Sequence, residues 1–148
     1  MSFLLDTNVV SEFRKRDRCD IGVAAWMSAA DPDALFLSVL VIGEIRRGIE
    51  NVRRRDSVTA EVLELWLNRL VAAHADRILP VDAPVAEAWG RLEAAASLPT
   101  IDGLLAATAL VHGLTLVTRN VRDFARTGVD CLNPFTGGRK SARRTARS

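Results

Sequence analysis

Short apolar runs alternate along the chain with longer segments in which apolar residues recur every three or four positions. Short runs are typical of buried strands, and the longer spacing is typical of helices with one buried face. The runs predict strands at residues 3–5, 35–37, 78–81, 114–118 and 129–132. The periodic segments predict helices at 9–15, 21–30, 39–51, 57–74, 83–96 and 103–112. This alternation predicts an α/β domain whose sheet is mostly parallel, with helices on both faces.

Polar residues, glycine and proline mark the expected ends of these elements. Thr7 and Asn8 are expected to cap the first helix, and Gly113 is expected to end the last one. Pro80 indicates that its strand lies at a sheet edge or ends there, since proline has no N–H to donate.

The longest helical segment, residues 57–74, has an apolar series at helical spacing. We expect one buried face made of Val58, Val62, Leu65, Trp66, Leu70 and Val71. The three tryptophans, Trp26, Trp66 and Trp89, all fall on helical stripes and are expected in the core or in an interface.

The composition narrows the class of protein. A chain of 148 residues suits one domain, and no apolar run is long enough to span a bilayer. Asp6 comes too early for the apolar region of a signal peptide, so the cytosol is the expected compartment. Cys19 and Cys131 are too isolated to suggest a disulfide framework or a zinc motif. We expect no membrane partner.

The formal net charge of +2 is unevenly distributed. Residues 137–148 hold five basic residues and no acid, which leaves 15 basic against 18 acidic residues in 1–136, or about −3. We therefore expect a folded domain at 1–136 and a basic, disordered tail at 137–148. This tail would either add salt-sensitive affinity for nucleic acid or serve only solubility, and the sequence leaves both open.

Four acids occupy special points of this layout. Asp6 follows the first strand, Asp102 stands where the helix 103–112 opens, and Asp123 follows the fourth strand by a short turn. Glu44 lies within an apolar stretch, where a wholly buried charge would be costly. Because ligands bind beyond the carboxyl ends of parallel strands, we expect all four carboxylates to converge at one edge of the sheet.

Convergent carboxylates repel one another. A pair 4 Å apart costs about 4 kcal/mol at an effective dielectric near 20, so either some of the acids protonate or a cation neutralises them. An all-oxygen site suits Mg²⁺ or Mn²⁺ rather than Zn²⁺. We expect Asp6 and Asp102 to hold the ion, with Glu44 and Asp123 in support or through water. Taken singly, each acid also has an ordinary interpretation as a cap, a turn residue or a solvated side chain.

Several neighbours of these acids are candidates for supporting roles. Polar residues near the strand ends that would orient water, phosphate or carboxylates are Thr7, Asn8, Thr118 and Asn120. Basic residues that would contact RNA are Arg46, Arg119 and Arg122, although Arg46 would equally suit a solvated helix face.

Segments 4–12, 38–45, 102–109 and 116–124 resemble the four acidic motifs of PIN-domain ribonucleases, and 132–135 is similar to a common ending of that family. The resemblance covers residues 2–135, in the expected order, and is closest to VapC-type toxins of bacterial toxin–antitoxin pairs. It places Asp6, Glu44, Asp102 and Asp123 at the acidic site. Asn120 falls where some relatives have another acid, so only a supporting polar role follows for it.

The resemblance implies a PIN-like α/β/α sandwich with a five-stranded, mostly parallel sheet. It also implies an endoribonuclease toxin that depends on Mg²⁺ or Mn²⁺, cleaves single-stranded or loop regions of RNA and blocks translation. Its implied partners are a second copy in a homodimer and a cognate VapB-like antitoxin, whose C-terminal segment wraps the toxin and often inserts an arginine. Whether the target is tRNA, rRNA or mRNA cannot be distinguished.

Two other functions are compatible with parts of the pattern. The chain would act as an RNA-binding translation inhibitor without cleavage if the site does not turn over. An aspartyl-phosphate phosphatase would use Asp6 as nucleophile, but that chemistry usually needs a second acid two residues later, where this chain has Asn8.

Overall fold

The computed structural model describes residues 1–136, and the expected basic tail at 137–148 lies outside the described residues. The strands are β1 (Phe3–Leu5), β2 (Leu35–Ser38), β3 (Ile78–Leu79), β4 (Thr115–Val117) and β5 (Cys131–Leu132). The α-helices are α1 (Thr7–Phe13), α2 (Ile21–Ala29), α3 (Val39–Arg53), α4 (Ser57–Ala73), α5 (Ala83–Ala95) and α6 (Thr100–His112). Short 3₁₀ turns are η1 (Arg16–Arg18), η2 (Pro32–Ala34), η3 (Ala75–Arg77) and η4 (Val121–Phe124). Every predicted strand and helix is present, with ends shifted by a few residues.

The five strands form one sheet in the order β3-β2-β1-β4-β5, and every pairing is parallel. This confirms the predicted fold class. β1 is the central strand, and its Leu4 and Leu5 are fully buried because layers cover both faces of the sheet. β3 is an edge strand and ends just before Pro80, as the proline indicated. All carboxyl ends of the strands therefore lie at the same edge, where β1 leads into Asp6 and β4 into Thr118.

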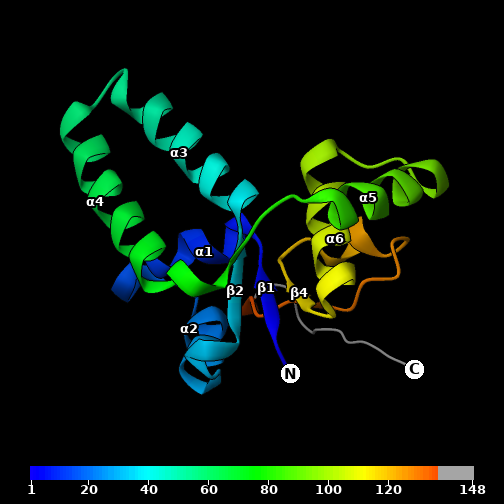
Figure 1. Cartoon of the computed structure of the whole chain (residues 1–148). Coiled ribbons are helices and arrows are strands. Elements are labelled where there is room, and N and C mark those ends of the chain that lie inside the picture. The colour runs from blue at the N-terminus through cyan, green and yellow to red at the C-terminus, as the bar shows by residue number, and fades with distance from the viewer. Residues whose placement is uncertain (137–148) are drawn as a thin grey trace.

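The helices form two groups on either side of the strands (Figure 1). One group contains α1 to α4, in which α1 contacts α2 and α3, and α3 pairs along its length with α4 as a projecting hairpin. The other group is the tightly packed pair α5 and α6, with α6 against β4. None of the described helices is on its own both long and apolar enough to cross a membrane, and only the bent pair of α5 and α6 reaches that length and composition jointly.

Two helix starts differ from the prediction in a way that matters for the site. Asp6, not Thr7 or Asn8, caps α1, because a side-chain oxygen of Asp6 accepts a hydrogen bond from the backbone N–H of Thr7 at 2.7 Å. Thr7 and Asn8 are helical residues, and their side chains are used for other contacts. α6 begins at Thr100, so Asp102 lies inside its first turn. Gly113 ends α6 with a left-handed backbone, φ 66°, as predicted.

The predicted buried face of α4 is partly wrong. Val58, Val62 and Leu65 are 74%, 62% and 55% exposed, respectively. The buried residues of this helix are Ala60, Leu67 and Leu70. The reason is that α4 packs mainly on α3 instead of on the sheet, so the neighbouring helix selects which of two apolar stripes is covered.

The prediction that the tryptophans lie in the core fits Trp26, which packs edge-to-face on Phe3 with ring centroids 5.1 Å apart.

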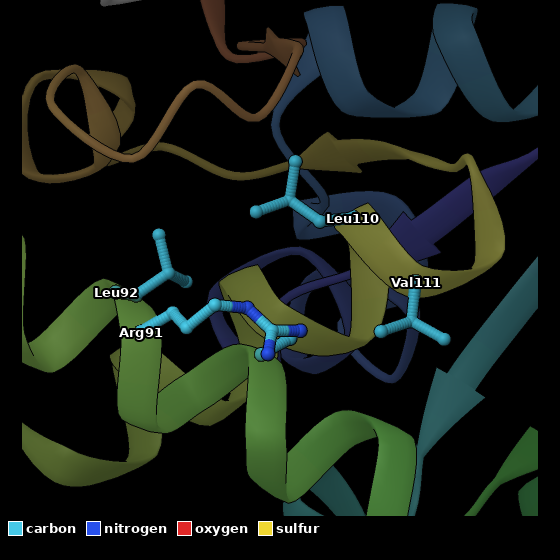
Figure 2. A pocket seen from close by; sticks show the side chains of 5 residues that line it. Arg91, Leu92, Leu110 and Val111 are labelled. Atoms are coloured by element: carbon cyan, nitrogen blue, oxygen red, sulfur yellow. The ribbon is translucent and has the colours of Figure 1, made fainter.

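A shallow apolar pocket lies where α5 and α6 meet, lined by Leu92, Leu110 and Val111 with Arg91 beside them (Figure 2). Leu110 and Val111 belong to the last turns of α6, about 12 Å along the helix axis from its first turn. This pocket is therefore separate from the strand ends.

Candidate active site

Asp6 is held in place by two neighbouring strands. It is only 7% exposed, and while its Oδ1 accepts from the backbone N–H of Thr7, its Oδ2 accepts from the Thr118 hydroxyl at 2.7 Å. Thr118 Oγ1 in turn accepts from the backbone N–H of Asn120 at 3.0 Å. These contacts fix the orientation of a nearly buried carboxylate at the end of β1.

Glu44 reaches the same place from α3. Its carboxylate accepts a hydrogen bond from the Thr7 hydroxyl, while the Thr7 backbone N–H bonds to Asp6. Thr7 therefore lies between the two acids and contacts both. Glu44 itself is half-buried.

The electrostatics of Asp102 connect all four acids. Burial raises the pKa of the Asp102 carboxyl, and the charges of Asp6, Asp123 and Glu44, in that order, raise it further. Burial also raises the pKa of Asp6, and the charge of Glu44 adds to this effect, although the hydrogen bonds from Thr118 and Thr7 oppose it. We call these four carboxylates the acidic rim.

Asp123 is the exposed member of the acidic rim. It lies in η4, which is anchored by the fully buried Phe124, and its backbone N–H donates to the Asn120 carbonyl at 2.9 Å. The turn that carries Asp123 is therefore fixed to the end of β4. Asn120 contributes backbone groups to this turn.

Asn8 joins α1 to the loop after β4. Its side-chain Oδ1 accepts from the backbone N–H of Arg119 at 3.2 Å, and its Nδ2 makes a longer contact of 3.5 Å with Thr118 Oγ1. Asn8 thus helps to hold the elements that carry Asp6 and Asp123 together.

The donor set of the acidic rim fits a hard divalent cation. Within residues 1–136, no three Asp, Glu, His or Cys side chains stand close enough to form a ready-made metal cluster. Mg²⁺ does not require such a cluster, because it usually keeps several waters and binds through one or two carboxylates. All the donors are oxygens, and a cation would relieve the repulsion that raises the pKa values of Asp6 and Asp102. Asp6 and Asp102 with water ligands therefore suit Mg²⁺ or Mn²⁺.

The structure places Arg46 in a different cluster. Its guanidinium lies 3.0 Å from both Glu50 and Glu64, so it links α3 to α4. Arg53 makes similar contacts with Glu50, Glu61 and Glu64. We call this cluster the α3–α4 clasp; its members are Arg46, Glu50, Arg53, Glu61 and Glu64.

Arg119 and Arg122 follow β4 and are exposed. The guanidinium carbon of Arg119 lies 4.0 Å from the centroid of the buried Phe135 ring, a cation–π contact that ties the loop after β4 to the segment after β5. Arg122 lies directly beside Asp123 in η4. Of the two, Arg122 is the one next to the acidic rim.

One buried acid near the site was missed as a candidate at the sequence level. Glu12 is 7% exposed, and its carboxylate accepts from Lys15 Nζ at 2.6 Å and from the backbone N–H of Asp20 at 2.9 Å. Burial alone would raise the pKa of Glu12, but these hydrogen bonds and the charges of Lys15 and Arg119 bring it below its ordinary value. Glu12 is a structural acid. Its signal in the sequence is a charge on the core side of a short helix.

Comparisons with known proteins agree with this geometry. A VapC ribonuclease, Y4jK, of Sinorhizobium fredii is 33% identical to the chain over 139 residues, covering 89% of this chain and 96% of that protein. Toxin FitB of Neisseria gonorrhoeae is 33% identical over 139 residues, covering 89% and 97%. The plasmid stability protein StbB of Pseudomonas syringae pv. tomato is 34% identical over 140 residues, covering 89% and 97%.

A solved structure matches the fold over the same share of the chain as the sequence relatives do. The crystal structure of FitAcB from Neisseria gonorrhoeae superposes with a TM-score of 0.82 at 33% sequence identity, covering 89% of this chain and 97% of that one. The family model described as PIN domain matches residues 3–130. The matched region holds strands β1 to β4, together with all four acids of the rim, and ends just before β5. The chain belongs to the PIN domain family.

Proposed function

We propose that this protein is a metal-dependent endoribonuclease that acts as the toxin of a toxin–antitoxin pair. The observation that carries the proposal is the acidic rim itself: Thr7 contacts both Asp6 and Glu44, and burial together with the charges of the other three carboxylates raises the pKa of Asp102. Relatives named as a VapC ribonuclease and as a toxin support the reaction class and the biological role. The Mg²⁺ or Mn²⁺ dependence rests on the donor set of the rim.

Asp6 and Asp102 would hold the cation, and Glu44 and Asp123 would support it directly or through water. When bound, a divalent cation polarises a phosphodiester and makes water a better nucleophile. Thr118 and Thr7 keep the Asp6 carboxylate oriented, so little reorganisation is needed when the cation binds. A rim carboxylate that does not hold the cation would accept the proton of the attacking water as a general base.

The substrate is proposed to be single-stranded or looped RNA, whose backbone phosphates need positive charge near an acidic site. Arg122 is the best placed of the three arginine candidates, since it is exposed beside Asp123. Arg119 is engaged with Phe135, and Arg46 with Glu50 and Glu64, so we assign them a smaller share in RNA binding.

The proposed protein partner is a VapB-like antitoxin. A groove runs between α1, α3 and α4, with Thr7 and Glu44 at one end and apolar walls that include Ile49, Leu63 and Trp66. An apolar antitoxin segment would fill these walls and bring an arginine to the acidic rim, where a guanidinium would replace the charge of the metal. The homodimer implied by the resemblance and the cytosolic location expected from the sequence remain predictions, and sedimentation of the purified chain tests the first.

Incubation of the purified protein with unstructured and hairpin RNAs, with Mg²⁺, with Mn²⁺ and with EDTA, tests the reaction. We expect cleavage only with a divalent cation, and its loss in Asp6→Asn. Asp17→Asn is a matched control, because Asp17 is an exposed acid in η1, outside the rim. Cleavage that persists in EDTA and in Asp6→Asn contradicts the proposal.

Growth arrest on expression separates cleavage from binding alone. A nuclease loses its toxicity in Asp102→Asn, whereas an RNA-binding inhibitor without cleavage keeps it. Sequencing of RNA 5′ ends after brief induction would identify the target.

A further inference from the structure

Trp89 of α5 lies against the residue that follows Asp102. A Cβ atom built on Gly103 would meet Trp89 Cδ1 at 3.0 Å and Trp89 Nε1 at 3.1 Å. These distances are shorter than ordinary van der Waals contacts, so the indole edge packs directly on the Gly103 backbone. A side chain at this position would require the ring to move by a few tenths of an ångström.

The first turn of α6 lacks the support that the other helices have. Among the six α-helices of residues 1–136, five begin with a side chain that accepts a backbone N–H: Asp6, Asp20, Ser38, Asp56 and Asp82. The N-cap residue of α6 is Pro99, whose side chain makes no such bond. An uncapped first turn is free to fray unless packing holds it.

The indole occupies this place at a cost. Trp89 Nε1 is buried, and no hydrogen-bond partner for it is present within the described residues 1–136. A buried donor without a partner destabilises a protein. The contact with Gly103 therefore rests on the shape of the ring and not on its N–H.

We infer that Trp89 is a positioning residue: by packing on Gly103 it fixes the uncapped first turn of α6, and through that turn the place of the Asp102 carboxylate opposite Asp6. Neighbouring residues of a helix point about 100° apart, so when Gly103 faces α5 the direction of Asp102 is set as well. This inference rests on the proposed metal site and adds a residue that touches neither metal nor substrate.

If Trp89 positions Asp102, its loss should change Mg²⁺ and Ca²⁺ binding by different factors, which a general loss of stability would not do. Mg²⁺ demands near-octahedral geometry at short distances, whereas Ca²⁺ accepts flexible geometry. A shift of Asp102 by a few tenths of an ångström therefore weakens Mg²⁺ binding more than Ca²⁺ binding.

The test is calorimetric titration of Mg²⁺ and Ca²⁺ into wild type, Gly103→Ala, Trp89→Leu and the double variant, with thermal melting alongside. Gly90→Ala is the matched control for the added methyl, since a Cβ on Gly90 of α5 meets nothing within 4 Å. Trp26→Leu controls for loss of an indole, because Trp26 packs on Phe3.

We expect Gly103→Ala and Trp89→Leu each to weaken Mg²⁺ binding about tenfold, at the low end for residues that orient metal ligands, and Ca²⁺ binding by clearly less. The double variant should lose less than the product of the two, because the new methyl no longer meets the ring. Both controls should keep the wild-type ratio of Mg²⁺ to Ca²⁺ affinity.

Two results separate the inference from the proposed function. If wild type binds neither ion, the metal site is wrong, and the inference is wrong with it. If wild type binds Mg²⁺ but Gly103→Ala and Trp89→Leu keep its affinity ratio, the inference alone is wrong. Should Trp89→Leu fail to fold, Gly103→Ala decides alone: a Mg²⁺ affinity that falls more than the Ca²⁺ affinity supports the inference, and an unchanged ratio of the two contradicts it.

Discussion

The acidic rim and the α3–α4 clasp use the same carboxylates in opposite ways. In the clasp, hydrogen bonds from Arg53 and Arg46 hold the pKa of Glu50 below its ordinary value, and those from Arg46 and Arg53 do the same for Glu64. Each acid there has an arginine within 3.0 Å. The charges of the acids in the clasp are therefore balanced by arginines, and the clasp joins α3 to α4.

In the acidic rim, burial and the other carboxylates raise the pKa values of Asp6 and Asp102. The Thr118 hydroxyl donates to Asp6 and the Thr7 hydroxyl donates to Glu44, and a hydroxyl orients a carboxylate without neutralising it. In the clasp, arginines neutralise Glu50, Glu61 and Glu64. In the rim, where Asp6 and Glu44 are bonded by hydroxyls and burial raises the pKa of Asp6 and of Asp102, a bound cation would supply the neutralising charge.

Loss of a rim acid should have the largest effect. Asp102→Asn keeps the shape of the side chain but removes a proposed ligand of the cation that would stabilise charge in the transition state, so we expect RNA cleavage at saturating Mg²⁺ to fall by about 10²–10³-fold. In the clasp, Glu64→Gln should leave the rate within about twofold, because its partners lie outside the rim. Initial rates on a fluorescent RNA measure both. Equal losses in the two variants contradict the distinction.

A divalent cation should raise the Tm of the protein by binding at the acidic rim, and the clasp should not contribute to this rise. Saturating Mg²⁺ adds about 2.7 kcal/mol at a hundredfold excess over Kd, which raises Tm by roughly 5–10 °C in a chain of this size. Asp6→Asn should melt at the same temperature with Mg²⁺ and with EDTA, whereas Glu64→Gln should keep the wild-type difference. Thermal melting followed by circular dichroism gives these values. A full Mg²⁺ response in Asp6→Asn argues against the site.

The two regions should also respond to pH in opposite directions. The folded pKa values of Asp6 and Asp102 are raised, so the folded state binds more protons, and in EDTA their contribution makes the protein more stable as pH falls from about 7 toward 5. The lowered pKa values of Glu50 and Glu64 contribute stability that is lost only at more acidic pH, as these groups protonate in the folded state.

Urea unfolding of wild type, Asp102→Asn and Glu50→Gln across this range separates the two contributions. Asp102→Asn should reduce the rise in the free energy of unfolding that wild type shows as pH falls from 7 to about 5. Glu50→Gln should keep that gain. If the free energy of unfolding of Asp102→Asn depends on pH as strongly as that of wild type, the Asp102 carboxyl is not the source of the gain in stability.

Breaking the clasp should give the smallest effect. Arg53→Met removes contacts with three acids, but these ion pairs are exposed, and exposed pairs contribute little. We expect Tm to fall by no more than about 3 °C, and by less at high salt, which screens the remaining charges. Differential scanning calorimetry at low and high salt checks this. A larger fall that salt does not reduce indicates a packing role for the Arg53 side chain.

The parallel sheet follows from the sequence, because buried strands that alternate with helices favour parallel pairing, but the strand order was not predicted. Asp6 and Thr118 are predictable neighbours, since each follows a strand and the carboxyl ends of parallel strands meet at one edge. The helix cap was not predictable in the same way. The same carboxylate of Asp6 caps α1 and belongs to the rim. N-cap preference alone does not decide between Asp6, Thr7 and Asn8.

The remaining errors come from partners that are distant along the chain. α4 has two apolar stripes of similar quality, and only its packing on α3 decides that Leu67 is buried and Val62 exposed. The contact of Arg46 with Glu64 was not predictable either, because Glu64 lies on another helix. The same holds for the contact of Arg119 with Phe135, which comes after β5. Tertiary contacts of this kind leave no periodic signal.

Site-resolved NMR titration of the Asp102 carboxyl carbon, in wild type and in Asp6→Asn, with and without Mg²⁺, tests the shared electrostatics of the acidic rim most directly. We predict a pKa above the ordinary 3.8 in the metal-free wild type, a lower value in Asp6→Asn, and a fall below 3.8 when wild type binds Mg²⁺. A pKa of Asp102 that neither the substitution nor Mg²⁺ changes would contradict the account.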